Sequence, residues 1–440
     1  MSCNEWKDSE IGRIPYKWDI YTVEELINME ILDKPLDGNH GSIHPTQKDF
    51  VQSGIPFIMA SDIKDGHIDY DSCKFITEEL SKTLKKGFAK EGDILLTHKA
   101  TIGRTCLVEK LNVPYIVLTP QVTYYRVLNH KKLNNKFLRY YFEFYKFKEL
   151  LNGWAQSGST RAYIGITSQR KLPILLPTLE EQEKIANILS SLDDKIQLNN
   201  EMNKTLEEMA QSIFKRWFVD FEFPNEDGEP YKSSGGEMVD SELGMIPKGW
   251  EVKELSQLVN IITKSEKPFE NEDILYEHFS IPALDSNKLP ILEFGNSISS
   301  NKYKIDNDCI LISKLNPNNK RIWNPYCNTS NSICSTEFIV YKAINNYPKS
   351  YIYEIINSDE FTKFLVANAT GSTGSRQRVK PKDTLGYKIV LPTIDKIIEI
   401  DKILSPIHKN IQLNTQESNT ILQIRNTLLP KLMSGEIKVN

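Results

Sequence analysis

The sequence predicts a mixed α/β protein: two similar α/β domains separated by two long antiparallel, coiled-coil-like helices, with a pseudo-twofold internal repeat. Three observations carry this prediction. Residues 179–220 contain no glycine or proline, and their apolar side chains recur at helical spacing. The segment that starts at Pro177-Thr178 recurs 215 positions later, and much of the rest of the 440-residue chain also recurs in the second half. Each copy combines short strand-like runs with a helical run, which is typical of a small mixed domain.

The two long helices are expected to pack on each other. Both segments contain the tetrapeptide Ile-Gln-Leu-Asn, and heptad numbering places Asn199 and Asn414 at the same a position among apolar residues. A buried asparagine at such a position lowers stability but fixes register and partner. We therefore expect Asn199 and Asn414 to lie in the seam between the helices. Two separate, solvent-facing amphipathic helices are the alternative interpretation.

The second helix differs from the first at one position. Pro406 stands where the first copy has Ser191. Because the pair Ser405-Pro406 suits the start of a helix, the sequence predicts a bend or break there. A short helix would precede this point and the long one would follow it.

The same order of elements is expected in both halves. The segment 9–18 returns as 241–250, with glycine, proline and tryptophan in the same places. Strand-like runs, a helical run, a Gly-Ser-Thr loop and a final strand then follow in each half. The main runs are 55–59, 93–97, 115–127, 134–152 (helical) and 172–177 in the first half, and 308–313, 347–366 (helical) and 387–392 in the second. The predicted boundaries are 1–178 for the first domain, 179–220 for the first helix, 221–242 for a linker rich in Pro, Gly, Ser and acid, 243–392 for the second domain and 393–440 for the second helix.

Charge is distributed unevenly. The formal net charge of −4 alone argues against nucleic acid as a partner. However, residues 179–220 carry 9 acids and 5 bases, and 221–242 carry 7 acids and 1 base. Residues 1–178 have 24 bases and 21 acids, and 243–392 have 18 bases and 16 acids. The two predicted domains are therefore mildly basic, which permits a DNA-binding face.

Composition and motifs exclude several other classes. The chain has 40% hydrophobic and 25% charged residues, which is typical of a globular protein. No signal peptide or membrane-span pattern is visible, so we expect a cytoplasmic protein with no membrane partner. The six cysteines form no CxxC pair, and His40 and His44 lie in a glycine-containing loop without a nearby acid. No metal site is expected from these residues.

Catalytic motifs are incomplete in this sequence. The segment 324–326 (Asn-Pro-Tyr) lacks one proline of an adenine methyltransferase box, and no glycine-rich loop for a methyl donor precedes it. Asp240, Glu251 and Lys253 have the order of a magnesium-dependent nuclease motif, but the first repeat lacks the lysine. Neither a P-loop nor a GxSxG elbow occurs. We therefore expect a binding protein with no catalytic residue and no cofactor of its own.

Basic residues beside flexible loops are the candidates for DNA contact. Small residues let the backbone approach a phosphate closely, while arginines reach phosphates or base edges. One set of candidates follows the Gly-Ser-Thr loops, and the other follows the equivalent strand-like runs 93–97 and 308–313. The first set is Arg161, Arg170, Lys171, Arg376, Arg378 and Lys380, and the second is Lys99, Arg104, Lys314, Lys320 and Arg321. Solubilising surface charge is the alternative explanation for these residues.

A family resemblance extends over essentially the whole chain, twice over. The segments GIPFIMASDIKDGHI, GDILLTHKATIGRT, GSTRAYI, LPILLPTLEEQEKIANILSSLDDKI and SELGMIPKGWEV closely resemble the specificity subunit of type I restriction-modification enzymes. The segment LPTLEEQEKIANILSSLDDKI is the most specific part of the match. Its second copy, LPTIDKIIEIDKILSPIHKNI, is more diverged.

The resemblance implies a division of labour between subunits. Two target recognition domains would each read one half of a split, asymmetric site on double-stranded DNA, and the two helices would set the distance between the halves. The subunit would have no catalysis of its own, and would dock two methyltransferase subunits and, through them, restriction subunits. S-adenosylmethionine, ATP and Mg²⁺ would belong to those partners. Trp217 and Phe218 are candidate docking residues, and a stand-alone DNA-binding or scaffold protein without methyltransferase partners is the alternative.

Overall fold

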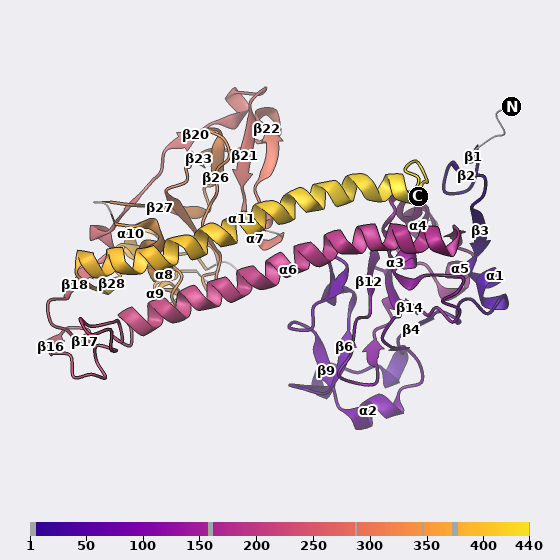
Figure 1. Cartoon of the computed structure of the whole chain (residues 1–440), viewed down its shortest axis with the longest axis horizontal. Coiled ribbons are helices and arrows are strands. Elements are labelled where there is room, and N and C mark those ends of the chain that lie inside the picture. Colours follow the sequence, from indigo (N-terminus) through magenta and orange to yellow (C-terminus); the bar gives the residue numbers. More distant parts are fainter. Residues whose placement is uncertain (1–5, 157–161, 287, 345–346, 372–376, 440) are drawn as a thin grey trace. The chain divides into compact units, whose positions relative to one another are not determined.

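The chain forms two compact units. The computed structural model describes residues 6–156, 162–286, 288–344, 347–371 and 377–439. The first unit comprises Met1–Lys195 and Ile421–Asn440, and the second comprises Ile196–Thr420. Each unit has its own sheets, its own helices and its own hydrophobic core (Figure 1). The predicted mixed α/β class with two sheet-rich parts and long helices is confirmed.

Two helices are far longer than the others. Both α6 and α11 contain 40 residues, and each contributes residues to both units. The α-helices are α1 (Val23–Asn28), α2 (Glu78–Thr83), α3 (Asn135–Glu143), α4 (Tyr145–Gln156), α5 (Ile166–Gln169), α6 (Leu179–Phe218), α7 (Ile281–Ser286), α8 (Lys349–Ile356), α9 (Asp359–Ala367), α10 (Pro381–Thr384) and α11 (Ile394–Met433). None of the helices among the described residues combines the length and the apolar character that crossing a bilayer requires.

The first unit contains a five-stranded sheet, a four-stranded sheet and three two-stranded ribbons. The larger sheets have the strand orders β10-β13-β6-β9-β5 and β12-β11-β14-β4. The strands are β1 (Trp6–Lys7), β2 (Ile14–Pro15), β3 (Asp19–Thr22), β4 (Leu36–Asp37), β5 (Phe50–Val51), β6 (Ile55–Ile58), β7 (Ile63–Lys64), β8 (His67–Ile68), β9 (Lys74–Ile76), β10 (Phe88–Ala89), β11 (Ile94–Lys99), β12 (Thr101–Leu107), β13 (Ile116–Leu118), β14 (Val122–Tyr125) and β15 (Pro173–Leu176).

The second unit contains a five-stranded sheet, a four-stranded sheet and two ribbons. The larger sheets have the orders β20-β23-β26-β21-β22 and β19-β27-β24-β25. The strands are β16 (Met238–Ser241), β17 (Gly244–Pro247), β18 (Glu251–Glu254), β19 (Val259–Ile261), β20 (Ser265–Glu266), β21 (Leu275–Phe279), β22 (Ile291–Phe294), β23 (Lys302–Lys304), β24 (Cys309–Ser313), β25 (Ile322–Trp323), β26 (Ser332–Ser335), β27 (Phe338–Ala343) and β28 (Lys388–Leu391).

The internal repeat is visible in the strand pairing of the two units. In the first, β11 pairs antiparallel with β14 and β12, and β13 pairs parallel with β6. In the second, β24 pairs antiparallel with β27 and β25, and β26 pairs parallel with β21. The last strand before each long helix pairs antiparallel with an early strand, β15 with β3 and β28 with β18. The two units are therefore built on one plan.

Each predicted helical run is divided into two helices. The sequence predicts one helix over residues 134–152, but α3 ends at Glu143, and the next residue, Phe144, is non-helical with φ −59° and ψ 128°. In the second unit, Ser358 separates α8 from α9 and accepts a hydrogen bond from the backbone N of Phe361 at its side-chain oxygen. A serine N-cap is an ordinary start for a helix. No glycine or proline marks the break at Phe144, so the sequence pattern alone could not reveal it.

Helix α6 begins with a capping box. The hydroxyl of Thr178 accepts from the backbone N of Glu181 at 3.3 Å, and the Glu181 carboxylate accepts from the Thr178 hydroxyl at 2.8 Å and from its backbone N at 3.3 Å. This reciprocal arrangement satisfies backbone donors that a helix N-terminus leaves unpaired. It explains why the helix starts directly after Pro177-Thr178.

Helix α11 runs through Pro406 without interruption, so the predicted division into a short and a long helix is wrong. A proline inside a helix costs about 3 kcal/mol. Its neighbours Ile400, Leu404 and Ile407 are buried in the core of the second unit. Burial of each such side chain contributes about 1.5–3 kcal/mol, which together outweighs the cost of the proline.

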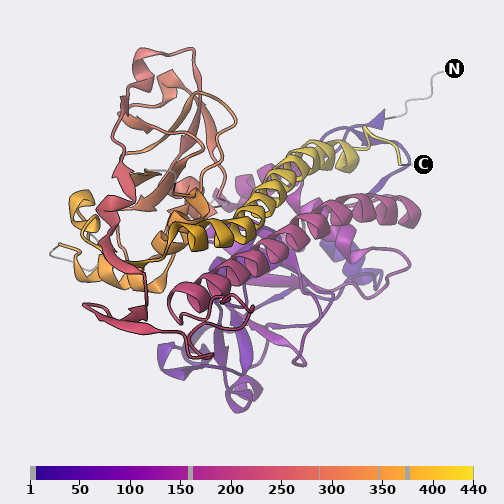
Figure 2. The same cartoon turned by 60° about the vertical axis from the view of Figure 1, so that its left-hand side comes forward.

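In the second unit, α6 and α11 run antiparallel to each other (Figures 1 and 2). Asn199 donates from Nδ2 to the backbone O of Asn414 at 3.4 Å. Asn414 in turn donates from Nδ2 to Asn203 Oδ1 at 2.9 Å. Asn199 is fully buried. Both asparagines at the shared heptad position therefore lie in the seam between the helices.

The segment 221–242 is more ordered than a linker. Phe221 and Phe223 are buried, and their ring centroids lie 5.7 and 4.8 Å from that of Trp250. The segment ends in β16, which forms a ribbon with β17. Its composition predicted a connecting linker, but aromatic packing fixes it to the second unit.

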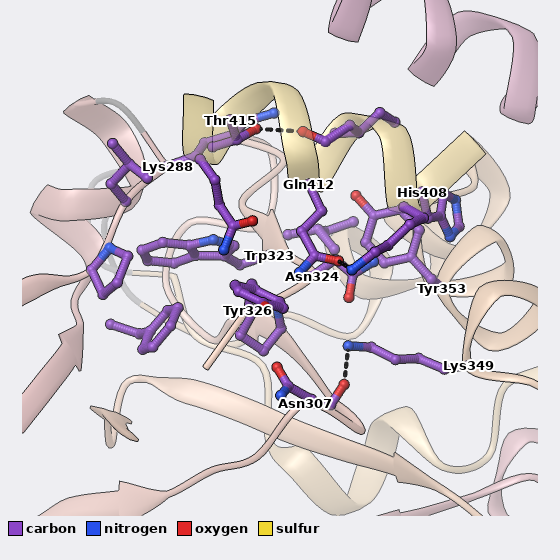
Figure 3. Close-up of a pocket in the computed structure, with 18 of the residues that line it drawn as sticks. Lys288, Asn307, Trp323, Asn324, Tyr326, Lys349, Tyr353, His408, Gln412 and Thr415 are labelled. Carbon is purple, nitrogen blue, oxygen red and sulfur yellow. Dashed lines mark hydrogen bonds between the residues drawn. The ribbon is translucent and has the colours of Figure 1, made fainter. Parts of the chain in front are cut away.

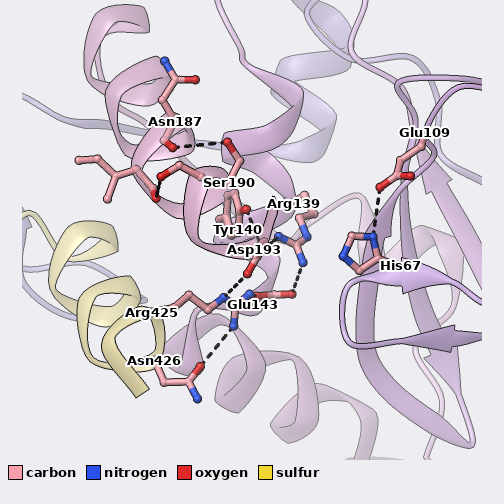
Figure 4. Close-up of polar contacts among 12 residues, drawn as sticks. His67, Glu109, Arg139, Tyr140, Glu143, Asn187, Ser190, Asp193, Arg425 and Asn426 are labelled. Carbon is pink, nitrogen blue, oxygen red and sulfur yellow. Dashed lines mark hydrogen bonds and ion pairs between the residues drawn. The ribbon is translucent and has the colours of Figure 1, made fainter. Parts of the chain in front are cut away.

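A cluster of buried charges joins three helices in the first unit (Figure 4). Arg139 on α3 pairs with Glu143 at 3.0 Å and with Asp193 on α6 at 2.7 Å. Arg425 on α11 contacts both carboxylates, at 3.0 Å from Nε to Asp193 Oδ1. The guanidinium of Arg139 also lies 4.4 Å from the ring centroid of Tyr140. Two cations and two carboxylates thus neutralise one another where the ends of α6 and α11 meet α3.

Candidate nucleic-acid interface

In the first unit, the end of β11 is held by the segment that follows the Gly-Ser-Thr loop. Ile164 donates its backbone N–H to His98 O at 3.0 Å, and Ala100 donates to Ala162 O at 3.0 Å. Lys99 forms an antiparallel bridge with Tyr163. Main-chain bonds therefore place Lys99, exposed at the tip of β11, beside Tyr163. We call residues 98–100 with 162–164 the strand-end edge of the first unit.

A buried histidine supports this edge from inside. His98 is fully buried, and its Nδ1 lies 2.9 Å from Ile164 O. Burial lowers the pKa of His98, while the hydrogen bond to the Ile164 carbonyl opposes that shift. A neutral imidazole that donates Nδ1–H to the carbonyl fits this geometry. The edge is thus tied to the core by a side chain as well as by the backbone.

The exposed face of the edge combines a cation with an aromatic ring. Lys99 Nζ lies 5.9 Å from the ring centroid of Tyr163, and the Tyr163 side chain is 44% exposed. Ala100 has φ +65°, a conformation that non-glycine residues rarely adopt outside tight turns. Arg104 on β12 is exposed, and its Nη1 donates to the carbonyls of Ala60 and Ile63, both at 3.2 Å. Lysine, arginine and tyrosine are suited to phosphate contact and base stacking.

The second unit has an equivalent strand-end edge, formed by residues 314–316 with 377–379. Asn316 donates its backbone N–H to Gln377 O at 2.9 Å, and Val379 donates to Lys314 O at 3.0 Å. Leu315 forms an antiparallel bridge with Arg378. Asn316 has φ +48°, as Ala100 has a positive φ in the first unit. The repeat thus extends to the connection between the strand end and the loop that follows α9.

Several of the basic candidates are already engaged within their unit. Lys314 turns inward, because its Nζ donates to Thr336 O at 2.6 Å and burial lowers its pKa. Arg378 pairs with Glu337 at 3.1 Å and stays exposed. Arg321 makes two bonds to the Asp285 carboxylate, at 2.6 and 2.8 Å. Of the cations in the second edge, Lys314 is thus engaged inward and Arg378 remains exposed.

The remaining candidates lie apart from the two strand-end edges or outside the described residues. Arg170 pairs with Glu24 at the start of α1, at 2.6 Å from Nη2 to Oε1. Lys320 lies 3.6 Å from the Asp359 carboxylate. Lys171 and Lys380 are exposed, and Lys380 precedes α10. Arg161 and Arg376 lie outside the described residues.

Tyr163 belongs to the edge of the first unit but was not predicted. It follows the Gly-Ser-Thr loop in the sequence RAYIGI, two residues after Arg161. An aromatic residue next to a basic one beside a flexible loop is a recognisable pattern for nucleic-acid contact, and it could have indicated Tyr163. The pairing of Tyr163 with Lys99 could not be read from sequence, because it depends on contacts between residues 64 positions apart.

The long helices also carry exposed apolar side chains at repeated positions. Leu198 and Leu413 are 50% and 48% exposed, and Met209 and Ile424 are 48% and 45% exposed. In both pairs, the second residue lies 215 positions after the first. Trp217 and Phe218, by contrast, are buried in the core of the second unit, so the prediction that they are exposed docking residues is wrong. Aromatic packing against Trp250 and Tyr351 accounts for the burial of Phe218.

No group of three or more His, Cys, Asp or Glu residues among the described residues could hold a metal ion. The five described cysteines (73, 106, 309, 327 and 334) are buried and unpaired. Of the residues in the nuclease-like motif, Lys253 pairs with Glu251 at 2.6 Å.

The chain is similar to known proteins over most of its length. A family model described as the type I restriction modification DNA specificity domain matches residues 15–208. The chain is 26% identical over 447 residues to the MjaIX specificity subunit of a type I restriction enzyme from Methanocaldococcus jannaschii, covering 99% of this chain and 97% of that protein. It is 27% identical over 345 residues to the HindI specificity subunit from Haemophilus influenzae, covering 62% of this chain and 71% of that protein.

A solved structure has the same fold. The S subunit of a type I restriction-modification system from M. genitalium aligns with a TM-score of 0.55 at 16% identity, covering 94% of this chain and 96% of that one. The chain is therefore similar along its whole length to specificity subunits of type I restriction enzymes, and residues 15–208 match the DNA specificity domain of that family.

Proposed function

We propose that this chain selects the DNA target of a type I restriction-modification complex by reading a bipartite, asymmetric site on double-stranded DNA. The observation that carries this proposal is the strand-end edge that occurs in both units. In each, main-chain bonds hold the end of the central strand against the segment after the Gly-Ser-Thr loop. One chain thus has two edges of the same construction but different side chains, which suits two different half-sites.

The free energies by which the two units discriminate against mismatched base pairs add together. A small domain reaches only a few base pairs, and each mismatched base pair costs about 1–3 kcal/mol. Lys99 and Tyr163 supply a cation and an aromatic ring in the first unit, and Arg378 supplies an exposed guanidinium in the second. We propose that these side chains, with Arg104, face the duplex. Different residues at equivalent places would make the target asymmetric.

We further propose that α6 and α11 set the spacing between the half-sites. Each helix has 40 residues without a break and contributes to both units. Buried Asn199 would oppose slippage of one helix along the other, because any other register leaves its polar atoms without partners.

We propose that two methyltransferase subunits dock on the exposed apolar side chains of the long helices. Leu198 and Leu413, like Met209 and Ile424, occupy corresponding places of the repeat. Two copies of one partner could therefore meet equivalent surfaces. Restriction subunits would join through the methyltransferases, in the cytoplasm. In this proposal the chain is non-catalytic, and S-adenosylmethionine, ATP and Mg²⁺ act on the partner subunits.

The spacing proposal is tested by lengthening both helices. Seven residues, one heptad, are inserted after Thr205 in α6 and after Gln412 in α11, so that Asn199 and Asn203 keep their contacts with Asn414 and Ser418. At ~1.5 Å per residue, the helices lengthen by ~10 Å, which corresponds to about three base pairs. Mapping methylated adenines in cells that carry the partner subunits should show the same half-sites with a spacer longer by about three base pairs.

The matched control is the same insertion in α6 alone. It mismatches the two helices and should abolish methylation without creating a new spacing. Unchanged spacing in the doubly lengthened chain would refute the proposed role of the helices. Failure of the chain to copurify with a methyltransferase would favour a stand-alone DNA-binding protein instead.

A further inference from the structure

A cavity of about 600 Å³ lies within the second unit, between α11, α8 and the strand β25 with the loop after it (Figure 3). Trp323, Tyr326 and Tyr353 are among its lining residues, together with amide side chains such as Asn324 and Gln412. Ligand pockets commonly have volumes of about 300–1,000 Å³ and mostly aromatic or apolar walls with a few polar groups. The cavity has the size and wall chemistry of a small-molecule site.

Each carboxylate that lines the cavity already has a partner. Glu354 Oε1 lies 2.7 Å from His408 Nε2, and Glu207 pairs with Lys288 at 3.2 Å. Glu277 accepts from two backbone N–H groups, at 2.9 and 3.0 Å, and from the Ser332 hydroxyl at 2.5 Å. The negative charges of the lining are therefore neutralised or fully hydrogen-bonded.

Two lining cations are not neutralised in this way. Lys349 Nζ donates to Asn307 O at 2.5 Å, and among the described residues no carboxylate lies within ion-pair distance of it. Burial lowers the pKa of Lys349 to about 8. Lys409 Nζ lies 5.5 Å from the ring centroid of Tyr326. Gln412 Nε2 is buried and has no hydrogen-bond partner in the described part of the chain. The cavity thus offers positive charge and one hydrogen-bond donor, Gln412 Nε2, that has no acceptor among the described residues.

The first unit has no equivalent of the Lys349 charge at the corresponding position of the repeat. Lys349 and Ser350 correspond to Leu138 and Arg139 in the repeat. Leu138 is fully buried, and Arg139 is neutralised by two carboxylates. The first unit therefore fills and balances this region with its own side chains. In the second unit, a lysine without a carboxylate partner lines a cavity.

We propose that this cavity binds a ligand in which a flat aromatic ring is joined to an anionic group, the chemistry of a nucleoside monophosphate. The ring would stack on Tyr326 and Trp323, the phosphate would accept hydrogen bonds from Lys349, and Gln412 Nε2 would donate to a ring acceptor. Binding supplies an acceptor for Gln412 Nε2 and an anionic partner for Lys349, which offsets the cost of leaving them without one.

The experiment measures binding of nucleoside monophosphates to the full chain by isothermal titration calorimetry. At least one of the adenine, guanine, cytosine and thymine nucleotides should bind, and its nucleoside should bind about tenfold more weakly or worse, because a charge-assisted hydrogen bond to the phosphate is lost. Inorganic phosphate alone should bind more weakly than the nucleotide, because it has no ring to stack. No nucleotide binding at millimolar concentration would overturn the proposal.

Two variants locate the site. Lys349→Met keeps the apolar stem and removes the charge, so the nucleotide should bind about tenfold more weakly or worse. Lys363→Met, on the exposed face of α9, is the matched control and should bind as the parent does. Gln412→Met tests the second donor independently, in case Lys349→Met fails to fold. Unchanged nucleotide affinity in a folded Lys349→Met or Gln412→Met variant would contradict the assignment.

One further arm distinguishes two sources of the ligand. A nucleotide could come from the free cellular pool, or it could be turned out of the duplex that the chain reads, in which case the inference rests on the proposed function. A fluorescent nucleotide bound to the chain is challenged with an excess of duplex DNA. Displacement in parallel with duplex binding assigns the site to DNA, and retention assigns it to free nucleotides. Because calorimetry needs neither a methyltransferase nor a DNA target, its outcome is separate from the test of spacing.

Discussion

Asn199 donates from Nδ2 to the Glu417 carboxylate at 2.8 Å and to the Ser418 hydroxyl at 3.2 Å, across the helix pair of the second unit. Its Oδ1 is buried and has no hydrogen-bond partner among the described residues. The pairing therefore specifies one register while leaving one acceptor unsatisfied.

Replacement of Asn199 by leucine should stabilise the second unit. An unsatisfied buried acceptor costs about 1–3 kcal/mol, and leucine also adds apolar burial, so the free energy of unfolding should rise by about 1 kcal/mol. Urea unfolding measures this change. Asn200→Leu, at the exposed neighbouring position, is the control and should change stability by less than about 0.5 kcal/mol. A loss of stability in Asn199→Leu would show that the three donated contacts outweigh the unsatisfied oxygen.

The ion pairs of Asp193 lead us to expect that the first unit loses stability at acidic pH. Burial alone would raise the pKa of its carboxyl group, but the charges of Arg139 and Arg425 outweigh burial, and the pKa lies below its ordinary value. Because the folded-state pKa is the lower one, ionised Asp193 stabilises the fold at neutral pH. This contribution is lost as the pH falls from the ordinary aspartate pKa of about 4 through the folded-state value.

Asp193→Asn should therefore lower stability at pH 7 by about 3 kcal/mol, because Arg139 loses a carboxylate partner. The further loss on acidification should be smaller than in the parent chain. Urea unfolding at pH 7 and at a pH of about 2.5, below the ordinary aspartate pKa, tests both statements. Asp194→Asn changes the exposed neighbour and should leave the acid sensitivity unaltered. Equal acid sensitivity in Asp193→Asn and the parent would contradict this role.

Lys99 should contribute to DNA affinity without selecting the base sequence. If it contacts a phosphate, Lys99→Ala should weaken binding of the assembled complex to all sequences alike and reduce the slope of log affinity against log salt by about 1. Filter binding at several salt concentrations measures that slope. Lys82→Ala, at a lysine that pairs with Glu78 on α2, is the control. An unchanged slope in Lys99→Ala would place the DNA elsewhere.

The repeated apolar positions predict the stoichiometry of the complex. Leu198→Glu should disrupt one of the two proposed docking surfaces, so that the purified complex contains one methyltransferase per chain in place of two. Leu198→Glu with Leu413→Glu should remove both. Leu128→Glu, at a residue that is 53% exposed in the first unit, is the control. Native mass spectrometry gives the ratio, and two methyltransferases on the double variant would exclude this surface.

Sequence patterns predicted the regular parts of the fold. The uninterrupted helical spacing of residues 179–220 corresponds to α6, and the duplicated strand order appears in both units. The prediction at Pro406 was wrong because tertiary burial of Leu404 and Ile407 overrides a local preference. The break at Phe144 carries no glycine or proline. Local rules describe what a segment prefers alone, and these two places are decided by its surroundings.

The candidate site was less predictable than the fold. Basic residues near the loops were identified by type, but their accessibility depends on partners distant in sequence. Arg170 forms an ion pair with Glu24, and Arg321 forms one with Asp285. A sequence pattern cannot predict either pairing, because the partners lie far apart in the chain. Trp217 and Phe218 look exposed on a helix considered alone, yet they pack on the second unit.

The strand-end edges are anchored by main-chain atoms: Ala100 N to Ala162 O in one unit, and Asn316 N to Gln377 O in the other. These hydrogen bonds involve only backbone atoms, so they do not depend on which side chains the residues carry. Side chains at positions such as 99 and 163 can therefore be exchanged while the scaffold beneath them keeps its geometry. If Tyr163 contacts DNA as proposed, its substitution would change that contact without rebuilding the loop that displays it.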